Sequence, residues 1–250
     1  MADQHTQQSP TPQLIGTVHR PDDISPEQRT RMCSLLNDFF ENVSQAQFDA
    51  DLAEKEWVFV FSDHRGTVQG FSTLMRLNVT VDGRPVVAVY SGDTLIHPDF
   101  WHELELPKLW GKHVFDLAAE VHAQTPNAKV YWFLISSGYK TYRFLPVFFE
   151  NFYPSYRQPT PPHIQRTIDA LAHYKFGDQY NPATGIIRFD HSAPLREGVA
   201  EVDERRLKNR DIAFFVEKNP GHAAGEQLAC LVEIDYANIT SAGMRMLGIL

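Results

Sequence analysis

The stretch VVAVYSGDTLI, residues 86–96, and the later stretch KVYWFLI, residues 129–135, decide the fold. Both are rich in β-branched and aromatic residues, which favours β-strands. Residues 130–135 are apolar throughout, as expected for a strand in the middle of a sheet. Between the two stretches, apolar residues at helical spacing from Leu106 predict a helix that ends near Gln124. The centre of the chain is therefore expected to fold as strand, helix and strand.

The residues before this centre predict further strands and an N-terminal helix. Ser25-Pro26-Glu27-Gln28 is a helix start, because Ser caps, Pro occupies the first helical position and Gln28 completes the capping box. Asp82-Gly83 is a hairpin signal that leads into the strand at 86–96. The remaining expected elements are a short helix at Phe48–Glu54 and strands at Leu14–His19, Trp57–Phe61 and Val68–Met75.

The residues after position 135 are aromatic-rich and then less regular. Tyr139–Phe152 predicts a helix that Pro146 must kink or displace. Four prolines in Pro154–Pro162 indicate a connector. Beyond it, the pattern predicts a helix at Ile164–Tyr174, with Asn219-Pro220-Gly221 as a hairpin connection, and strands at Gly185–Phe189, Ile212–Val216 and Leu228–Ile234.

The polar N-terminus and the proline-rich connector divide the 250 residues into three parts. Residues 1–13 are polar and hold two prolines, so they are expected to form a disordered tail. Residues 14–153 form the patterned core. Residues 154–250 form a C-terminal extension expected to complete the sheet and to frame an acceptor side.

Composition excludes several classes of protein. Hydrophobic residues make up 43% of the chain, which is enough for a sizeable core. The net charge of −8 argues against a nucleic-acid binder. Cys33 and Cys230 are too few for a disulfide scaffold or a zinc cage, and no metal site is expected. The sequence lacks a membrane-spanning run and a secretory signal, so a cytoplasmic protein is expected.

The order of elements, β-α-α-β-β-β-α-β-α, resembles the GNAT superfamily of acyltransferases over about 140 residues. The segment VYWFLISSGYKTYRFLPVFFENFYP, residues 130–154, is also similar to a group of uncharacterised bacterial GNAT-like proteins. The resemblance implies an α/β (α+β) fold with a mixed, mostly antiparallel sheet flanked by helices. It also implies that strand four (86–96) and strand five (129–135) are parallel and splay apart, and that an acyl thioester enters the gap.

One segment departs from the family pattern. The family follows strand four with an Arg/Gln-x-x-Gly-x-Gly/Ala loop that holds the pyrophosphate of coenzyme A through backbone N–H groups. Here the segment is HPDFWHELELPKLWGK, residues 97–112, and Glu103 and Glu105 replace glycines. Three alternatives follow. Lys112, with Trp110 and Gly111, makes a displaced phosphate contact; the donor is acyl carrier protein rather than acyl-CoA; or the site is catalytically silent.

Asp93 and His97 are the candidates for handling the proton of an amine. An acid within an apolar strand requires a partner or a function, so Asp93 is a candidate general base or amine acceptor. The alternative is a bulge in which Asp93 bonds to neighbouring backbone. His97 follows the strand near the expected reaction centre and is a candidate base. The alternative is a loop histidine that packs beside Pro98.

The resemblance supplies further candidates around strand five. In many members a tyrosine on the following helix protonates the departing thiolate. Tyr142, and after it Tyr139, match that position, although both are also candidates for the aromatic core. Ser136 and Ser137 are candidates for donor binding or for the cap of that helix. On strand four, the residues expected to line the donor are Thr94, Leu95 and Ile96.

The predicted function is N-acyl transfer by direct attack of an amine on a thioester. Acyl-CoA or acyl-ACP, an acyl carrier protein thioester, is the expected donor, and a small-molecule amine or a peptide is the expected acceptor. The aromatic residues around strand five favour a medium or long fatty acyl chain, although a core needs them as well. The alternative is a GNAT-like module that binds an acyl thioester or lipid without turnover. The oligomeric state is left open.

Overall fold

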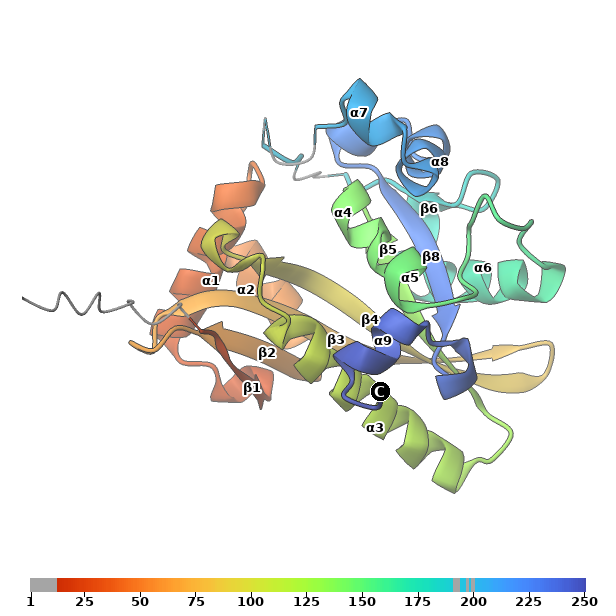
Figure 1. The fold of residues 1–250 in the computed structure, drawn as a ribbon, viewed down its shortest axis with the longest axis horizontal. Coiled ribbons are helices and arrows are strands. Elements are labelled where there is room, and N and C mark those ends of the chain that lie inside the picture. The colour runs from red at the N-terminus through yellow and green to blue at the C-terminus, as the bar shows by residue number, and fades with distance from the viewer. Residues whose placement is uncertain (1–12, 191–193, 197, 199–200) are drawn as a thin grey trace, which may run out of the picture.

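The computed structural model describes residues 13–190, 194–196, 198 and 201–250 (Figure 1). Its centre is an eight-stranded sheet with the strand order β1-β2-β3-β4-β5-β8-β7-β6. The strands are β1 (Ile15–His19), β2 (Trp57–Ser62), β3 (Val68–Val81), β4 (Arg84–Ile96), β5 (Lys129–Ser136), β6 (Tyr180–Asn181), β7 (Ile186–Ile187) and β8 (Gln227–Glu233). The strands predicted at 86–96 and 129–135 are thus neighbours in the centre of the sheet.

The β4–β5 pair is the parallel pair of this sheet among the described residues, and its neighbours pair antiparallel. A parallel pair needs a crossover, and α3 (Glu105–Gln124) provides it. The hairpin predicted at Asp82-Gly83 joins β3 to β4, and both residues have positive φ, as a tight two-residue turn requires. The predicted mixed, mostly antiparallel sheet is therefore confirmed.

Helices cover both faces of the sheet. On one face, α1 (Pro26–Phe39), α2 (Gln45–Ala53) and α6 (Pro162–Phe176) pack on apolar side chains of the strands. On the other face lie α3, α4 (Tyr139–Tyr142), α5 (Phe144–Phe148), α8 (Arg210–Lys218) and α9 (Ser241–Met246). The cap predicted for α1 is present, because Ser25 accepts a hydrogen bond from the Gln28 backbone N–H.

Three predicted elements are wrong in detail. Residues 212–216 form part of α8 rather than a strand, because Asn209 caps a helix that buries Ile212 and Phe215 one turn apart. The segment Asn219-Pro220-Gly221 therefore joins a helix to β8 and is not a hairpin connection. The helix predicted at 139–152 is the two short helices α4 and α5, and the chain becomes extended at Phe149.

The N-terminal tail and the missing membrane-spanning run are the remaining expectations drawn from composition. The tail predicted at 1–13 lies outside the described residues, apart from Gln13. Among the helices that the structure describes, none is long and apolar enough to cross a membrane.

Candidate active site

The β4 and β5 strands part at one end. Their parallel pairing runs from Val86 opposite Lys129 to Ser91 opposite Leu134. Beyond this point β4 continues to Ile96 along β3, and β5 continues to Ser136 along β8. Each of the two strands thus stays paired with its neighbour on the other side, β3 or β8, but β4 and β5 no longer pair with each other. Residues 92–96 of β4 and 135–136 of β5 therefore share no strand pairing, and we call this unpaired stretch the opening.

A β-bulge in β4 lies at the start of this opening. Leu74 of β3 pairs with Ser91, and Ser72 pairs with Thr94, so Gly92 and Asp93 together oppose the single residue Thr73. A bulge bends its strand and increases its local twist, which turns the end of β4 away from β5. The bulge of the alternative interpretation is present at the start of the opening, but the Asp93 side chain makes no hydrogen bond to the backbone of a described residue.

Strand alternation identifies the backbone groups that face the opening. The His97 N–H bonds to the Gln69 carbonyl on β3. Because successive residues of a strand direct their N–H and C=O groups to opposite sides, those of Thr94 and Ile96 point toward β5. The Ile96 carbonyl accepts a hydrogen bond from the Trp101 indole at 2.7 Å. The hydroxyl of Thr94 lies 2.7 Å from that of Ser72.

Asp93 is a half-buried carboxylate beside the bulge. It shares its face of the sheet with Leu95, which packs in the cluster under α1 and α2. No hydrogen bond or ion pair joins its side chain to a described residue. Burial raises the pKa of Asp93 to about 6, against the opposing effect of the Lys55 ammonium. A carboxylate with such a pKa is a better proton acceptor near neutrality than an exposed aspartate.

Lys55 lies across the bulge. Its ammonium donates to the Asp51 carbonyl at 2.8 Å, and a Cβ on Gly92 would stand 2.7 Å from its Cε. The same Cβ would stand 2.4 Å from Oγ1 of Thr73, a buried hydroxyl without a hydrogen-bond partner among the described residues. Gly92 therefore provides the room in which Lys55 approaches β4. Burial lowers the pKa of Lys55, and the nearby Lys175 adds to this effect.

His97 lies at the far end of β4, four residues beyond Asp93. Its Nδ1 faces the Asp99 backbone N–H at 3.4 Å, and its ring packs on Phe100 with the centroids 6.4 Å apart. Four strand residues span about 13 Å, so one reacting atom cannot touch both His97 and Asp93. The structure does not bring these two candidate bases together.

The two candidate tyrosines differ in their surroundings. Tyr142 is fully buried, and its hydroxyl donates to the Pro154 carbonyl at 2.9 Å. Tyr139 stands at the first position of α4, directly after β5, and its hydroxyl makes no hydrogen bond to a described residue. The guanidinium of Arg206 lies over its ring, 5.8 Å from the centroid. Both tyrosines are buried in the same core cluster, and they differ in that only the Tyr142 hydroxyl is hydrogen-bonded to a described residue.

Ser136 and Ser137 are buried at the end of β5. The Ser136 hydroxyl donates to the Gly138 carbonyl at 2.7 Å, and the Ser136 carbonyl accepts from Asn219. The interpretation of these serines as helix caps is wrong, because Gly138 occupies the N-cap position of α4 and no side chain caps it. Ser136 shapes the turn that ends β5.

The acidic residues before α3 are engaged with the edge strand β1. Glu103 accepts a hydrogen bond from the Leu14 backbone N–H at 2.8 Å, and Glu105 lies over Gly16. Gly111 is buried against Leu247 of the C-terminal segment. Lys112, in the second turn of α3, is exposed and pairs with Asp116. These contacts connect the segment to β1 and to the C-terminus, and none of them frames a loop for a phosphate.

Trp101 and Lys140 bridge the wide end of the opening. Trp101 follows β4 and bonds to its last carbonyl, whereas Lys140 belongs to α4, which follows β5. The Lys140 ammonium lies 4.0 Å from the centroid of the Trp101 indole, a cation–π contact. The two segments that leave the parted strands therefore meet again above the opening.

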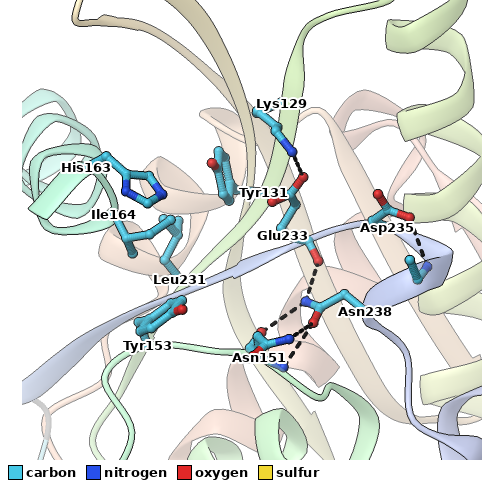
Figure 2. A pocket seen from close by; sticks show the side chains of 11 residues that line it. Lys129, Tyr131, Asn151, Tyr153, His163, Ile164, Leu231, Glu233, Asp235 and Asn238 are labelled. Carbon is cyan, nitrogen blue, oxygen red and sulfur yellow. Dashed lines mark hydrogen bonds and ion pairs between the residues drawn. The ribbon is translucent and has the colours of Figure 1, made fainter. Parts of the chain in front are cut away.

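Two cavities lie away from the opening. The one in Figure 2, about 370 Å³, is lined by Lys129, Tyr131 and Glu233 at the opposite end of β5. There Asn238 bonds to Asn151 and to the Glu233 carbonyl, so its amide is saturated. The second, about 540 Å³, lies between residues 154–160, α6 and α8. Neither cavity contains the candidate residues of β4.

Lys55, Thr73 and Trp101 were missed as site residues in the sequence. Lys55 follows α2 and Thr73 belongs to β3. Both reach the bulge, and no local pattern marks them. Gly92 is the one visible signal, because a glycine within a strand indicates a bulge or a close approach.

No family model and no curated protein matches the chain. The solved structures that are similar to it include the following three. A probable N-acyltransferase from Enterococcus faecalis is 15% identical with a TM-score of 0.40, covering 55% of this chain and 33% of its own. A GNAT N-acetyltransferase from Escherichia coli, in complex with CoA, is 18% identical with a TM-score of 0.35, covering 55% and 70%. A GCN5-related N-acetyltransferase from Sphaerobacter thermophilus is 12% identical with a TM-score of 0.35, covering 94% and 91%.

This chain thus spans a third of the length of the Enterococcus protein. The expected meander β2–β3–β4, the crossover α3 and the parted parallel pair β4–β5 are all present. The chain therefore has a divergent GNAT-like fold.

Proposed function

We propose that this protein is an N-acyltransferase that moves an acyl group from a thioester to an amine. The observation that carries the proposal is the parting of β4 and β5 beyond Ser91 and Leu134. A pantetheine arm is a narrow, extended chain with amide groups, and it can pair with strand edges that have lost their neighbour. The backbone groups of Thr94 and the backbone N–H of Ile96 supply such an edge on β4.

Different residues around the opening serve different steps of the reaction. The Thr94 backbone N–H polarises the thioester carbonyl, since a fixed donor stabilises the negative charge that develops on its oxygen. Asp93 accepts the proton of the attacking amine. Tyr139 donates a proton to the departing thiolate. The C–S bond breaks as the C–N bond forms, so no covalent enzyme intermediate is needed.

The acceptor approaches from the face of the sheet that carries Asp93. This face holds the Asp51 carboxylate near Asp93 as well, and both acids favour a positively charged amine. A small-molecule amine or a lysine side chain of a peptide fits this charge. Acyl-CoA is the donor we propose first. Acyl carrier protein is the alternative donor, because the segment before α3 lacks the glycine loop that holds coenzyme A in the family. The aromatic side chains around β5 favour a medium or long acyl chain.

A catalytically silent acyl-binding module is the second candidate, because the segment before α3 offers no phosphate loop. One assay distinguishes the two. The purified protein is mixed with acyl-CoA and acyl-ACP of several chain lengths and with a panel of amines, and release of free thiol is followed. Release that depends on the amine supports the transferase. Acyl-thioester binding without thiol release supports the module.

The site assignment has its own control. Asp93→Asn is expected to lower the rate by about 100-fold, which is the usual contribution of a general base. Asp178→Asn removes an exposed carboxylate outside β4 and is expected to keep the full rate. Equal rates in both variants would contradict the role of Asp93.

A further inference from the structure

Two positively charged side chains stand at the mouth of the opening. Lys140 belongs to α4, directly after β5, and its ammonium covers the indole of Trp101 at 4.0 Å. Arg206 belongs to α7 (Glu204–Leu207), and its guanidinium covers the ring of Tyr139 at 5.8 Å. Since Tyr139 and Lys140 are consecutive, both cations flank the first turn of α4. Figure 1 shows α7 above the end of β5 from which α4 leaves.

These cations are close to each other and poorly neutralised. Burial lowers the pKa of Lys140, and the like charge of Arg206 lowers it further. No carboxylate of a described residue lies within 4.0 Å of the Lys140 ammonium. Arg206 has one such neighbour, Asp203 at 3.7 Å, and both of those side chains are largely in solvent. Two like charges held close together repel each other, so an anion bound between them would be stabilised.

The alternative place for an anion, the N-terminus of α3, is unfavourable. Leu104 occupies the N-cap position without a side-chain cap, and the acids Glu103 and Glu105 stand on either side of it. Glu103 also leaves its Oε1 buried without a partner among the described residues. An added phosphate would meet these carboxylates at short range, where like charges repel strongly.

We propose that Lys140 and Arg206 bind the phosphate groups of the thioester donor at the mouth of the opening, in place of a loop before α3. This inference rests on the proposed function, because it assigns how the donor of that reaction is held. Arg206 offers the planar fork that matches two phosphate oxygens, and Lys140 adds a compact point charge. The Trp101 indole keeps Lys140 over the opening.

The chemistry recognised is a phosphate ester attached to pantetheine. Coenzyme A carries a diphosphate at this position, and a carrier protein carries a phosphodiester. Binding is measured by calorimetry with CoA, 4′-phosphopantetheine, pantetheine and holo-acyl carrier protein. Pantetheine has no phosphate, so its affinity measures binding to the opening alone. The comparison of CoA with the carrier protein identifies the source of the phosphate.

Lys140→Met and Arg206→Met keep apolar stems and remove one charge each. Each is expected to weaken binding of CoA, or of the carrier protein if that is the donor, by about tenfold, as for a lost charged hydrogen bond. Pantetheine binding is expected to stay unchanged in both. Arg84→Met is the control, because it removes one charge from the opposite end of β4.

Two results would overturn the inference and leave the proposed function intact. One is wild-type affinity for every phosphate-bearing ligand in both variants. The other is a loss confined to Lys112→Ala, which would place the phosphate on α3. If the wild-type protein binds none of the four ligands and releases no thiol, the proposed function fails together with this inference.

Discussion

Trp132 on β5 donates its indole N–H to the hydroxyl of Ser91 on β4 over 2.9 Å. Ser91 is the last residue of β4 that pairs with β5, so this side-chain bond spans the point where the strands part. The Trp132 indole also packs on Trp110 of the crossover helix, with centroids 4.5 Å apart. The narrow end of the opening is therefore held by one hydrogen bond and by a tilted pair of indole rings that connects it to α3.

Ser91→Ala is expected to destabilise the protein, because it leaves the largely buried Trp132 N–H without an acceptor. An unsatisfied buried donor costs about 1–3 kcal/mol. Urea denaturation of the variant and of Ser62→Ala, a control at the end of β2, measures the difference. Equal unfolding free energies for Ser91→Ala and the wild type would show that the bond does not hold the strands.

The two strands that border the opening could be predicted, because the sequence pattern that indicates each strand lies within that strand. Residues 130–135 are uniformly apolar, and 86–96 combine β-branched residues with a single glycine. Residues 212–216 share that apolar character, yet they form α8. A five-residue apolar run fits one buried strand or one side of a short helix equally well. The Asn209 cap, which decides between them, was the signal that the prediction left unused.

The site could be predicted only where the polarity of one residue differs from that of its neighbours in the sequence. Asp93 stands out as an acid within an apolar strand, and Gly92 beside it marks the bulge. Lys55, which lies across that bulge, and Trp101, which bridges the mouth, are ordinary residues in their local sequence. Their roles depend on contacts between separate elements, and a single sequence does not encode those contacts in any spacing.

The raised pKa of Asp93 predicts how stability depends on pH. Between its ordinary value of 3.8 and about 6, the folded state binds more protons than the unfolded state. This carboxyl therefore lowers stability as pH rises across that window, and the loss persists above it. Asp93→Asn is expected to be more stable than the wild type by about 1–3 kcal/mol at pH 8. The difference should vanish below pH 4.

Thermal or urea unfolding at several pH values tests this expectation. Asp178→Asn serves as the reference, because it makes the same change at an exposed carboxylate. A variant at position 93 that is less stable than the wild type at pH 8 would mean that the charged carboxylate stabilises the fold through a partner.

Lys55→Met tests the electrostatic link between Lys55 and Asp93. The Lys55 charge opposes the burial that raises the pKa of Asp93, so its removal should raise that pKa further above 6. Activity that requires the deprotonated carboxylate rises with pH through this pKa. The midpoint of the pH–rate profile should therefore move to higher pH. Lys129→Met, at the opposite end of β5, should leave the midpoint in place, and so would Lys55→Met if the two groups were independent.

Tyr139→Phe and Tyr142→Phe separate catalysis from packing at α4. The Tyr142 hydroxyl bonds to the Pro154 carbonyl in the core, so its loss should cost about 1 kcal/mol of stability. Its transfer rate should change little. Tyr139→Phe should keep its stability and lose rate, because a thiolate that leaves unprotonated is a poorer leaving group. Unfolding free energies and single-turnover rates of the two variants provide the comparison. The reverse pattern, with rate lost only in Tyr142→Phe, would return the role of proton donor to Tyr142 and require the core around Pro154 to open during the reaction.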